Sequence, residues 1–490
     1  MKKQKNDPTS NGINPKKIPL AIAILGFSRE GRAVLSYLQK NPNYRNSQIT
    51  ICDQNPKIKN LIQKSYSDVL ENIRIRTGKN YLKNLTQFNL IVRSPGIPYR
   101  VPEIQKARRA GVTISSATKL FFDEIRNINE PRTDTKLRTN KSSRKYPRTR
   151  LPSYHPTHSP IVVGITGTKG KGTVATLLTK MLQASGKKIV LVGNIGDPAL
   201  QELERSKRAD VVVIELSSFQ LQDLTNSPDI AVVLDIYPDH LDSHKTFSEY
   251  VRAKSTITRY QQKNDSVFYF PKNRSTQSIA ALSKGKKIPI TANQFKFFKP
   301  ADLKIRGNHN FQNAVIAARV AAHLGCSKNA IKKIASTFKG LSHRLELVRI
   351  LRTTHYGLRT TVSFYDDSIA TIPEATMAAL RSFREPIILY LGGHDKGSIY
   401  GALAKKIKKS TVQGIVVFGE NKEKIKSAMQ MTKLPMHLFT KFKPAIHAAY
   451  QMAKKYKKAI VLLSPGATSF PYFTDYADRG NQFQKIVKEL

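Results

Sequence analysis

Short apolar runs alternate with amphipathic stretches along most of the chain. The first run, "IPLAIAILGF", precedes a glycine turn and a helical pattern, and the next, "QITICD", ends at Asp53. After "FNLIVRSPGIP" and a polar stretch, the alternation resumes at Ile161, and further apolar runs lie near "EPIILYLGG", "GIVVFG" and "AIVLLSPG". Apolar strands that alternate with helices are typical of parallel sheets covered by helices. The pattern therefore predicts an α/β protein with parallel sheets in three successive sections.

Two segments depart from this pattern. Residues 126–160 contain nine Lys/Arg, two Asp/Glu, five prolines and few large aliphatic residues, a composition typical of a flexible linker. Residues 1–17 are polar and basic, which predicts a disordered tail. A length of 490 residues also exceeds what one core holds. We expect a basic tail at 1–17, a Rossmann-like N-terminal domain at 18–125, a basic linker at 126–160, a P-loop-type central ATPase domain at 161–340 and a Rossmann-like C-terminal domain at 341–490.

The charge balance is strongly basic, with 82 Lys and Arg against 34 Asp and Glu and a net charge of +48. Such a field attracts polyanions without specifying a fold, and the chain carries no aromatic RNA-binding signature. We therefore expect any polyanion binding to be nonspecific. The two cysteines, Cys52 and Cys326, are too few for a disulfide framework, which favours a reducing compartment. The apolar runs are shorter than the roughly 18 residues that span a bilayer, so we expect no membrane insertion.

The stretch "VVGITGTKGKGTVATLL" contains a glycine-rich loop, residues 167–171, between an apolar strand and a helix. Such a loop lets backbone N–H groups surround phosphate oxygens, and a lysine such as Lys171 neutralises the β- and γ-phosphates. The next residue is Gly172, where a magnesium-binding hydroxyl is expected, and Thr173 follows one place late. The stretch therefore predicts a nucleotide site of unusual spacing.

Downstream residues could hold a metal ion beside this loop. The strand in "ADVVVIELSSFQL" ends at Glu215, and a carboxylate at that position is suited to Mg²⁺. The run "DIAVVLDIYPDHLDSH" carries His240 and His244, and "YVRAKSTI" carries Lys254. Taken alone, these histidines are more often surface or capping residues, and the lysine would be a solvated residue of a helix.

Eight motifs occur in the order found in the Mur ligases: "GITGTKGKGT", "ELSSFQL", "PDHLDSHKTFSEYVRAK", "GNHNFQN", "LSHRLE", "DDSIAT", "LGGHDKG" and "LSPGATSFPYFTDYADRG". The sequence resembles this family over nearly all of residues 18–490. "ELSSFQL" and the C-terminal motif make it most similar to the members that add D-glutamate.

The resemblance implies a three-domain, ATP-dependent ligase of peptidoglycan precursor synthesis. The first domain would bind the UDP end of UDP-N-acetylmuramoyl-L-alanine, the second would bind ATP and two Mg²⁺ ions, and the third would bring D-glutamate. The terminal alanine carboxylate would become an acyl phosphate, which the D-glutamate amine then attacks. A cytoplasmic monomer is expected.

The resemblance also assigns candidate residues. Lys171, His240 and Lys254 would be catalytic, and Lys254 matches a lysine that is carbamylated. Metal contacts would come from Thr173, Glu215, His240 and Lys254. ATP would be held by Gly167, Thr168, Lys169, Gly170, Lys171, Gly172, Thr173, Asn310, Asn313, Arg344 and Asp367. The UDP substrate would be held by Gly26, Ser28, Arg29, Gly31, Asp53, Ser94 and Asn194. D-glutamate would be held by Thr371, Lys396, Ser469, Phe470 and Tyr476.

Some positions depart from the family pattern. Gly172 replaces a hydroxyl residue, as in the related folylpolyglutamate synthases, so Thr173 would supply the hydroxyl. Lys169 and Asp366 stand where asparagine is common, Ile369 replaces a lysine, and Tyr476 replaces a phenylalanine.

These departures leave three alternatives open: a Mur ligase for another amino acid, a folylpolyglutamate synthase-like ligase, and a basic nucleic-acid-associated ATPase. A folate enzyme would not need the UDP-type first domain. An ATPase without ligase activity would need damaged metal and amino-acid residues.

Overall fold

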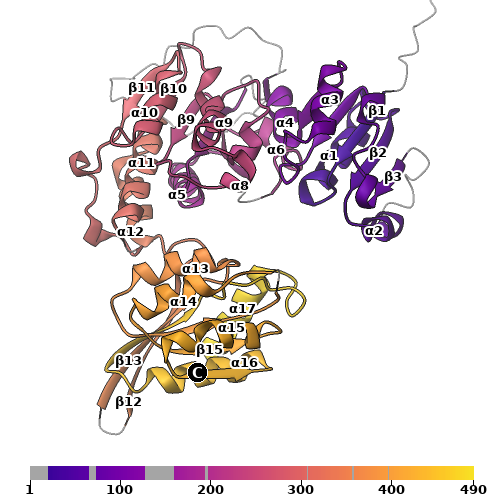
Figure 1. The fold of residues 1–490 in the computed structure, drawn as a ribbon. Helices are drawn as coiled ribbons and strands as arrows, with labels where there is room; N and C mark the ends of the chain where they lie inside the picture. The colour runs from indigo at the N-terminus through magenta and orange to yellow at the C-terminus, as the bar shows by residue number, and fades with distance from the viewer. Residues whose placement is uncertain are drawn as a thin grey trace, which may run out of the picture. The chain divides into compact units, whose positions relative to one another are not determined.

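A computed structural model of the chain describes residues 20–65, 73–126, 159–193, 197–305, 307–355, 358–395 and 397–490. The predicted tail at 1–17 and almost all of the predicted linker lie outside these residues. The chain divides into two compact units, the first formed by Met1–Lys171 and Gly186–Thr291 and the second by Gly172–Ser185 and Ala292–Leu490 (Figure 1).

The first part of the first unit is a five-stranded parallel sheet in the order β3-β2-β1-β4-β5. Residues of β1 alternate between its two faces: Ile22 and Ile24 belong to one core cluster, and Ala23 and Leu25 belong to another. This sheet is therefore buried on both sides, as its continuous apolar runs predict. Its elements are β1 (Ala21–Leu25), α1 (Arg29–Lys40), β2 (Gln48–Asp53), α2 (Ile58–Ser65), β3 (Ile73–Thr77), β4 (Leu90–Arg93), α3 (Pro102–Arg109), β5 (Thr113–Ser116) and α4 (Ala117–Arg126).

A second parallel sheet, of six strands, follows in the order β11-β10-β9-β6-β8-β7. Helix ends here are capped by side chains: Thr246 accepts a bond from the backbone of Glu249 at the start of α9, and Ser217 forms a capping box with Gln220. The elements are β6 (Ile161–Thr166), α5 (Lys171–Gln183), β7 (Ile189–Gly193), α6 (Leu203–Lys207), β8 (Val211–Glu215), α7 (Ser218–Leu221), β9 (Ile230–Val233), α8 (Leu241–His244), α9 (Phe247–Arg259), β10 (Ser266–Tyr269), α10 (Arg274–Ala281) and β11 (Lys286–Pro289).

The second unit contains the helical part of residues 172–185, the helices α11 (Asn308–His323) and α12 (Lys328–Thr337), and a third sheet. This sheet has the order β12-β13-β17-β14-β15-β16, with α13, α14 and α15 contributing to the core on one face and α16 and α17 on the other. Its elements are β12 (Glu346–His355), β13 (Leu358–Asp366), α13 (Pro373–Ala379), β14 (Ile387–Leu391), α14 (Gly401–Lys408), β15 (Val412–Phe418), α15 (Lys422–Met429), β16 (Met436–Phe439), α16 (Phe442–Ala453), β17 (Lys458–Leu463) and α17 (Tyr476–Glu489).

The prediction of a parallel sheet in every section is wrong for this third sheet. The edge strand β12 pairs with β13 in antiparallel fashion, whereas the other pairs in the sheet are parallel. The two strands follow each other along the chain with only residues 356 and 357 between them. A parallel pair needs a crossover of a dozen or more residues, so a connection this short permits only a hairpin.

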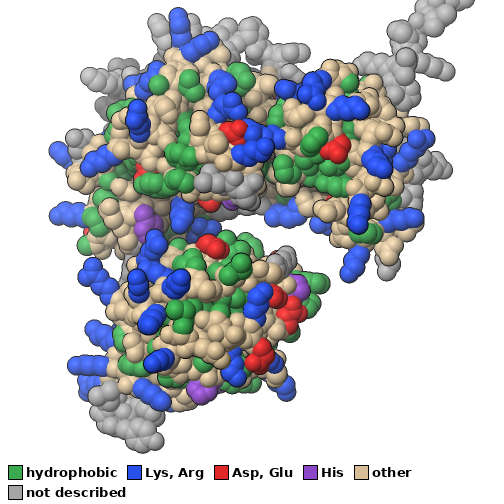
Figure 2. Space-filling model, in the orientation of Figure 1, with side chains coloured by type: hydrophobic (Ala, Val, Ile, Leu, Met, Phe, Trp, Pro, Cys, Tyr) green, Lys and Arg blue, Asp and Glu red, His purple; other side chains and the backbone are tan. Residues whose placement is uncertain are grey.

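The distribution of charged side chains on the surface agrees with the strongly basic composition. Lysine and arginine side chains are spread over the visible face of the molecule and do not gather into one patch (Figure 2). Among the described residues, no helix combines the length and apolarity needed to cross a membrane.

Candidate active site

The phosphate loop runs from the end of β6 into α5, which begins at Lys171. Gly167 and Gly170 have φ values of 153° and 86°, and a Cβ on Gly167 would lie 2.6 Å from the Cβ of Leu234. Only glycine fits such a position, so the backbone itself shapes the loop. The Lys171 Nζ donates to the carbonyls of Gly167 and Thr168 at 3.1 and 3.2 Å, which keeps the ammonium at the mouth of the loop.

Glu215 stands at the carboxyl end of β8, which is paired with β6 in the same sheet. The residue is 6% exposed, and its Oε2 atom is buried without a hydrogen-bond partner among the residues that the structure describes. A buried carboxylate oxygen that lacks a donor is suited to a cation. Gly193, at the end of β7, makes room for the Glu215 backbone, because a Cβ there would lie 2.4 Å from the Glu215 carbonyl oxygen. These observations fit the prediction that Glu215 binds Mg²⁺.

Lys254 projects from α9 into the sheet and is only 1% exposed. Its Nζ donates to the Thr166 Oγ1 at 3.2 Å and to the Gly167 carbonyl at 3.0 Å, and it lies 4.7 Å from the centre of the Tyr250 ring. Burial first, and then the charge of Lys171, lower the pKa of Lys254 well below its usual value. The side chain is therefore not the solvated lysine that its sequence position alone would suggest.

Two histidines follow β9, and the structure separates their roles. His240 is exposed, has a φ of 53°, and lies 3.8 Å from a carboxylate oxygen of Asp239. His244 is buried, stacks on Phe219, and hydrogen-bonds the Ser218 Oγ through its Nε2 at 2.9 Å. Burial lowers the pKa of His244 and so favours its neutral form within the packing, whereas the His240 side chain is exposed at the surface.

The predicted UDP-binding residues converge at the carboxyl edge of the first sheet. Ser94, which follows β4, donates its Oγ to the Gly26 carbonyl at 3.0 Å, and Asp53 at the end of β2 accepts the backbone N–H of Phe27 at 2.7 Å. A Cβ on Gly31 would lie 2.1 Å from the Gly26 carbonyl oxygen, so this glycine allows α1 to approach the turn. Strand β1 lies between β2 and β4, where the chain order reverses, and ligands of open α/β sheets bind at that point.

The remaining UDP candidates are placed less centrally. Ser28 precedes the first residue of α1 and leaves its hydroxyl uninvolved in capping. Arg29 forms an exposed ion pair with Asp197 at 3.4 Å. Asn194 lies outside the described residues.

Helices of the second unit carry three of the expected ATP contacts. Thr173 lies in the first turn of α5 and is buried. Asn310 and Asn313 are three residues apart in α11, so they project from the same face of the helix. Asn310 is half-buried and Asn313 is 7% exposed.

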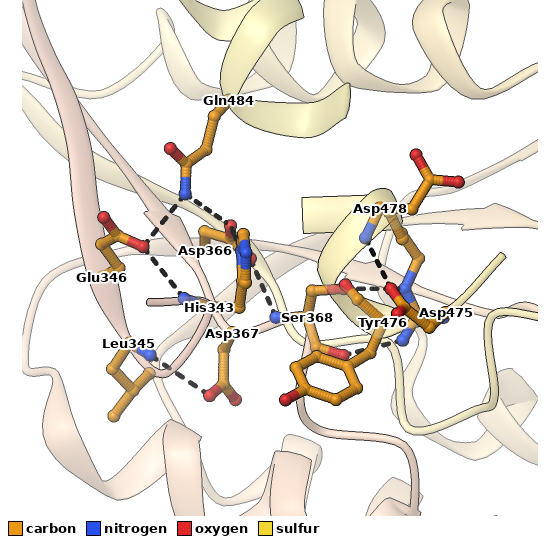
Figure 3. A network of polar contacts seen from close by, with 11 residues as sticks. His343, Leu345, Glu346, Asp366, Asp367, Ser368, Asp475, Tyr476, Asp478 and Gln484 are labelled. Carbon is orange, nitrogen blue, oxygen red and sulfur yellow. Dashed lines mark hydrogen bonds and ion pairs between the residues drawn. The ribbon is translucent and has the colours of Figure 1, made fainter. Parts of the chain in front are cut away.

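A network of polar contacts joins the start of β12, the end of β13 and α17 in the C-terminal domain (Figure 3). His343 Nδ1 and the Asp366 Oδ2 are 2.7 Å apart, and the Gln484 amide donates to both Asp366 and Glu346 at 3.0 Å. The hydrogen bond to Asp366 raises the pKa of His343. A Cβ on Gly480 would lie 2.1 Å from the His343 Nδ1, so this glycine lets α17 reach the pair. The carboxylate of Asp366, at a position where the family often has asparagine, therefore has a structural role.

His343, Glu346 and Asp366 have ligand atoms within 4.8 Å of one another, a spacing that could suit a metal ion. However, the oxygens of Glu346 and Asp366 that face this centre already accept bonds from the Gln484 amide and from His343. The cluster is satisfied by its own hydrogen bonds, and we interpret it as a structural centre that holds the neighbouring residues.

The next residue, Asp367, is the buried carboxylate expected to contact ATP. Its Oδ2 accepts from the Ser464 Oγ at 2.7 Å and its Oδ1 accepts from the Leu345 backbone at 3.2 Å. Burial nevertheless raises its pKa to about 7. Arg344, which is exposed, precedes Leu345 in the same loop. The structure thus brings these two predicted ATP contacts onto adjoining loops.

The predicted D-glutamate residues lie on segments that meet at α17. The Ser368 Oγ donates to the Tyr476 carbonyl at 2.7 Å, and the buried Arg479 guanidinium donates to the carbonyls of Ser368 and Ala467 at 2.8 and 3.0 Å. Through these bonds Arg479 connects Ser368, in the loop that continues to Thr371, with Ala467, which lies two residues before Ser469.

The other candidates around this pocket differ in exposure. Phe470 is 65% exposed and Tyr476 is 39% exposed, and Ile369, the departure from the family pattern, is half-buried. Lys396 lies outside the described residues.

The structure also identifies residues that motif reading did not select. Tyr250 lies against Lys254, while Arg479 and Gln484 tie α17 to the ends of β12 and β13. Tyr250 and Arg479 lie inside quoted motifs and Gln484 lies shortly after the last one, and this position was the signal in the sequence that could have identified them. Arg93 and Asp223, which form a buried ion pair at 3.0 Å, were missed entirely because nothing in the sequence links positions 130 residues apart.

Comparison with known proteins agrees with this arrangement. Family models match three successive parts of the chain: a MurD-like N-terminal domain at 20–116, the Mur ligase middle domain at 165–299, and the glutamate ligase domain of Mur ligases at 343–466. A UDP-N-acetylmuramoylalanine–D-glutamate ligase from Acetivibrio thermocellus is 32% identical, with 96% of each chain covered. The chain belongs to the Mur ligase family. A second ligase of the same name, from Clostridium novyi, is 31% identical over 85% of this chain and 86% of its own length.

Solved Mur ligase structures share the fold at low sequence identity. The UDP-N-acetylmuramate–alanine ligase MurC of Thermotoga maritima has a TM-score of 0.52 at 15% identity and covers 96% of this chain and 99% of its own. MurF of Acinetobacter baumannii has a TM-score of 0.50 at 17% identity and covers 67% of this chain and 77% of its own. The predicted α/β architecture of three Mur ligase domains is confirmed, and the chain is a MurD-like member of the family.

The burial of Lys254 generates a first prediction. Burial lowers the pKa of Lys254 and so favours the neutral amine relative to a solvated lysine, and the neutral amine is the form that attacks CO₂ to give a carbamate. We expect Lys254→Ala to lose on the order of 100-fold or more in kcat, as removal of a metal-orienting group does, and to be partly rescued by acetate or formate. The control is Arg252→Ala on the exposed face of the same helix, which should leave turnover unchanged. A free amine at Lys254 in the mass spectrum of the active enzyme would contradict carbamylation.

The raised pKa of Asp367 generates a second prediction. The pKa of this carboxyl is about 7 in the folded protein against 3.8 as the ordinary value, so the folded state binds the proton more tightly. Its contribution to the free energy of unfolding therefore decreases as pH rises from about 4 to about 7, and then stays constant. In Asp367→Asn this decrease should be absent. Thermal unfolding measured from pH 5 to pH 8 should show a smaller fall in Tm for Asp367→Asn than for the wild type. The exposed control Glu374→Gln should follow the wild type.

Proposed function

We propose that the chain joins D-glutamate to UDP-N-acetylmuramoyl-L-alanine in peptidoglycan precursor synthesis. The observation that carries the proposal is the 32% identity to a D-glutamate ligase over 96% of both chains, which includes the N-terminal domain. That domain presents Gly26, Asp53 and Ser94 together at the switch point of its sheet. A folylpolyglutamate synthase-like ligase would have no use for this site. An ATPase that lacks ligase activity would need damaged metal and amino-acid residues, whereas Glu215 and Lys254 are both present and buried.

The proposed reaction proceeds in two balanced steps. An oxygen of the alanine carboxylate bonds to the γ-phosphorus of ATP while the bond from that phosphorus to the β-bridging oxygen breaks, which gives an acyl phosphate and ADP. The amine of D-glutamate then attacks the acyl carbon and loses a proton, and the tetrahedral intermediate collapses with loss of phosphate to leave an amide. A carboxylate is a poor electrophile without such activation.

The protein's own groups fit these steps. Backbone N–H groups of the loop at residues 167–171 and the N-terminus of α5 would hold the ATP phosphates, with Lys171 neutralising charge on the group transferred. The unpartnered Oε2 of Glu215, together with His240 and a carbamylated Lys254, would hold two Mg²⁺ ions, which supply further charge neutralisation when bound. Arg344 and Asp367 would contact the nucleotide. Thr371, Ser469, Phe470 and Tyr476 would surround the amino acid, and Lys396 would pair with one of its carboxylates.

The proposal includes a monomer that acts in the cytoplasm, where ATP and the UDP-linked substrate are available. The decisive assay is ADP release with UDP-N-acetylmuramoyl-L-alanine and, in turn, D-glutamate, L-glutamate, D-aspartate and L-lysine. Turnover with D-glutamate alone supports the proposal. Turnover only with another amino acid would identify a different Mur ligase, and ADP release without any amino acid would favour an ATPase.

A third prediction concerns the shifted hydroxyl of the phosphate loop. Lys171→Ala should lose most turnover, because the positive charge that neutralises the transferred phosphate is lost. Thr173→Val should weaken Mg²⁺-dependent nucleotide binding, which calorimetry with an ATP analogue measures with and without Mg²⁺. Thr179→Val is the matched control, since Thr179 lies in the same helix and its buried hydroxyl has no partner within the described part of the chain. Equal binding by both threonine variants would remove the assigned role of Thr173.

A fourth prediction concerns Lys396 and the amino acid. Loss of a charge-assisted contact of about 1.5–3 kcal/mol predicts that Lys396→Ala raises the KM for D-glutamate on the order of ten- to a hundredfold. Tm and the KM for ATP should stay close to wild type. Lys424→Ala is the control for a purely structural role, because Lys424 supports the same turn through Asp395 at 2.9 Å. An unchanged KM for D-glutamate in folded Lys396→Ala would mean that the amino-acid pocket has been placed wrongly.

A further inference from the structure

The guanidinium of Arg93 is buried between the N-terminal part and the central part of the first unit. Arg93 is the last residue of β4 and is 1% exposed. Its Nη1 donates to the carbonyls of Ile97 at 2.6 Å and Ser94 at 3.3 Å. Its Nη2 donates to the Phe219 carbonyl and to the Asp223 Oδ2, both at 3.0 Å. One side chain therefore serves four acceptors on two segments that are more than 120 residues apart.

Both segments belong to the expected active site. The carbonyls of Ser94 and Ile97 lie in the turn after β4, which carries the predicted UDP contact Ser94. Phe219 and Asp223 lie in or just after α7, the short helix that follows Glu215 and β8. Asp223 is held from the N-terminal side as well, because the Ser116 Oγ donates to its Oδ1 at 3.2 Å.

A second contact joins the other UDP-binding turn to the same short helix. Gln220 of α7 donates its Nε2 to the Glu30 Oε1 at 3.0 Å, and Glu30 lies in the first turn of α1, directly after the turn that contains Gly26. Gln220 is itself fixed by a capping box with Ser217. The turn that contains Gly26 and the turn after β4 together carry predicted UDP-binding residues, and we call them the UDP surface. Both turns are thus attached to residues 217–223 of the central domain.

The chemistry of this contact requires an arginine. The guanidinium is planar and its two terminal nitrogens point in fixed directions, so one nitrogen can serve the turn while the other serves Phe219 and Asp223. A lysine ammonium has a single nitrogen and cannot serve both sides with this geometry. A buried carboxylate and a buried guanidinium also depend on each other, because either one alone would be an uncompensated charge in the interior.

We propose that Arg93 is a positioning residue for UDP-substrate binding: it fixes the turn at residues 94–97 against α7 and so holds the UDP surface in register with the central domain. This inference rests on the proposed function for the identity of the substrate. Arg93 itself is buried beneath the turn and acts through the backbone of Ser94 and Ile97.

The chain offers a matched control for this role. Arg126, at the end of α4, also joins the N-terminal part to the central sheet with a forked arrangement: its Nη1 lies 2.9 Å from the Asp229 Oδ1 and its Nη2 donates to the Ser227 carbonyl at 2.8 Å. None of these bonds involves either UDP-binding turn. Arg126→Lys therefore disturbs the attachment of the two parts without touching the turn.

The experiment compares Arg93→Lys with Arg126→Lys in the full chain. We expect Arg93→Lys to raise the KM for UDP-N-acetylmuramoyl-L-alanine on the order of ten- to a hundredfold, the effect of misplacing a binding surface by about 1 Å. The KM values for ATP and D-glutamate should remain near wild type, as should all three values in Arg126→Lys. A fall in Tm with no selective rise in the KM for the UDP substrate would show a merely structural contact and would overturn the proposal.

A second readout needs no substrate and separates this inference from the proposed function. Hydrogen exchange should increase selectively at residues 94–97 in Arg93→Lys, where the Ile97 amide bonds the Ser94 carbonyl, but not in Arg126→Lys. Unchanged exchange at these residues overturns the proposal, whatever amino acid the enzyme uses. Increased exchange in a chain that fails to ligate D-glutamate would support the positioning role while refuting the assigned reaction. If Arg93→Lys does not fold, Asp223→Asn, which keeps the shape of the partner, is measured in the same two ways.

Discussion

In a parallel sheet all strands end at the same edge, and in each sheet of this protein that constraint places candidate residues together. Asp53 ends β2 and Ser94 follows β4, both neighbours of β1, whereas Glu215 ends the strand beside β6 and Asp367 follows β13. The turns that leave this edge must be tight and must present backbone N–H groups, so glycines with positive φ, such as Gly26 and Gly167, recur there. Segments far apart in sequence thereby become neighbours, as in the contact of Lys254 with the Gly167 carbonyl.

Burial then affects the chemistry of groups in each unit. Lys254 and Asp367 are both surrounded by protein, and in each case desolvation disfavours the charged form. The shift favours the neutral amine of the lysine and lets the aspartate hold a proton near neutral pH. His343 shows the opposite direction, because its hydrogen bond to Asp366 raises its pKa more than burial lowers it. Local surroundings thus shift the pKa values of these three groups in different directions.

Sequence reasoning predicted the elements that depend on local patterns. The strand–loop–helix at Lys171, the carboxylate at the end of β8 and the β1–α1 turn all have signals within a few residues, namely apolar runs, glycines and strand-end polar groups. The antiparallel pairing of β12 was missed because the alternation of strands and helices in the rest of the section predicted parallel pairs. The two-residue connection between β12 and β13 is instead too short for a parallel crossover. The Arg93–Asp223 pair and the network around His343 depend on tertiary packing, and no local pattern in the chain predicts them.

The attachment of both UDP-binding turns to residues 217–223 has a consequence for protein engineering. A substrate-recognition domain of a multidomain enzyme is commonly exchanged at its linker, which here would mean a cut within the predicted linker at 126–160. A chimaera cut at that point would separate Arg93 from Asp223 and Glu30 from Gln220, and so leave charges from each parent buried opposite foreign partners. The unit of exchange is therefore discontinuous: a transplanted N-terminal domain must bring the short helix α7 of its own parent with it.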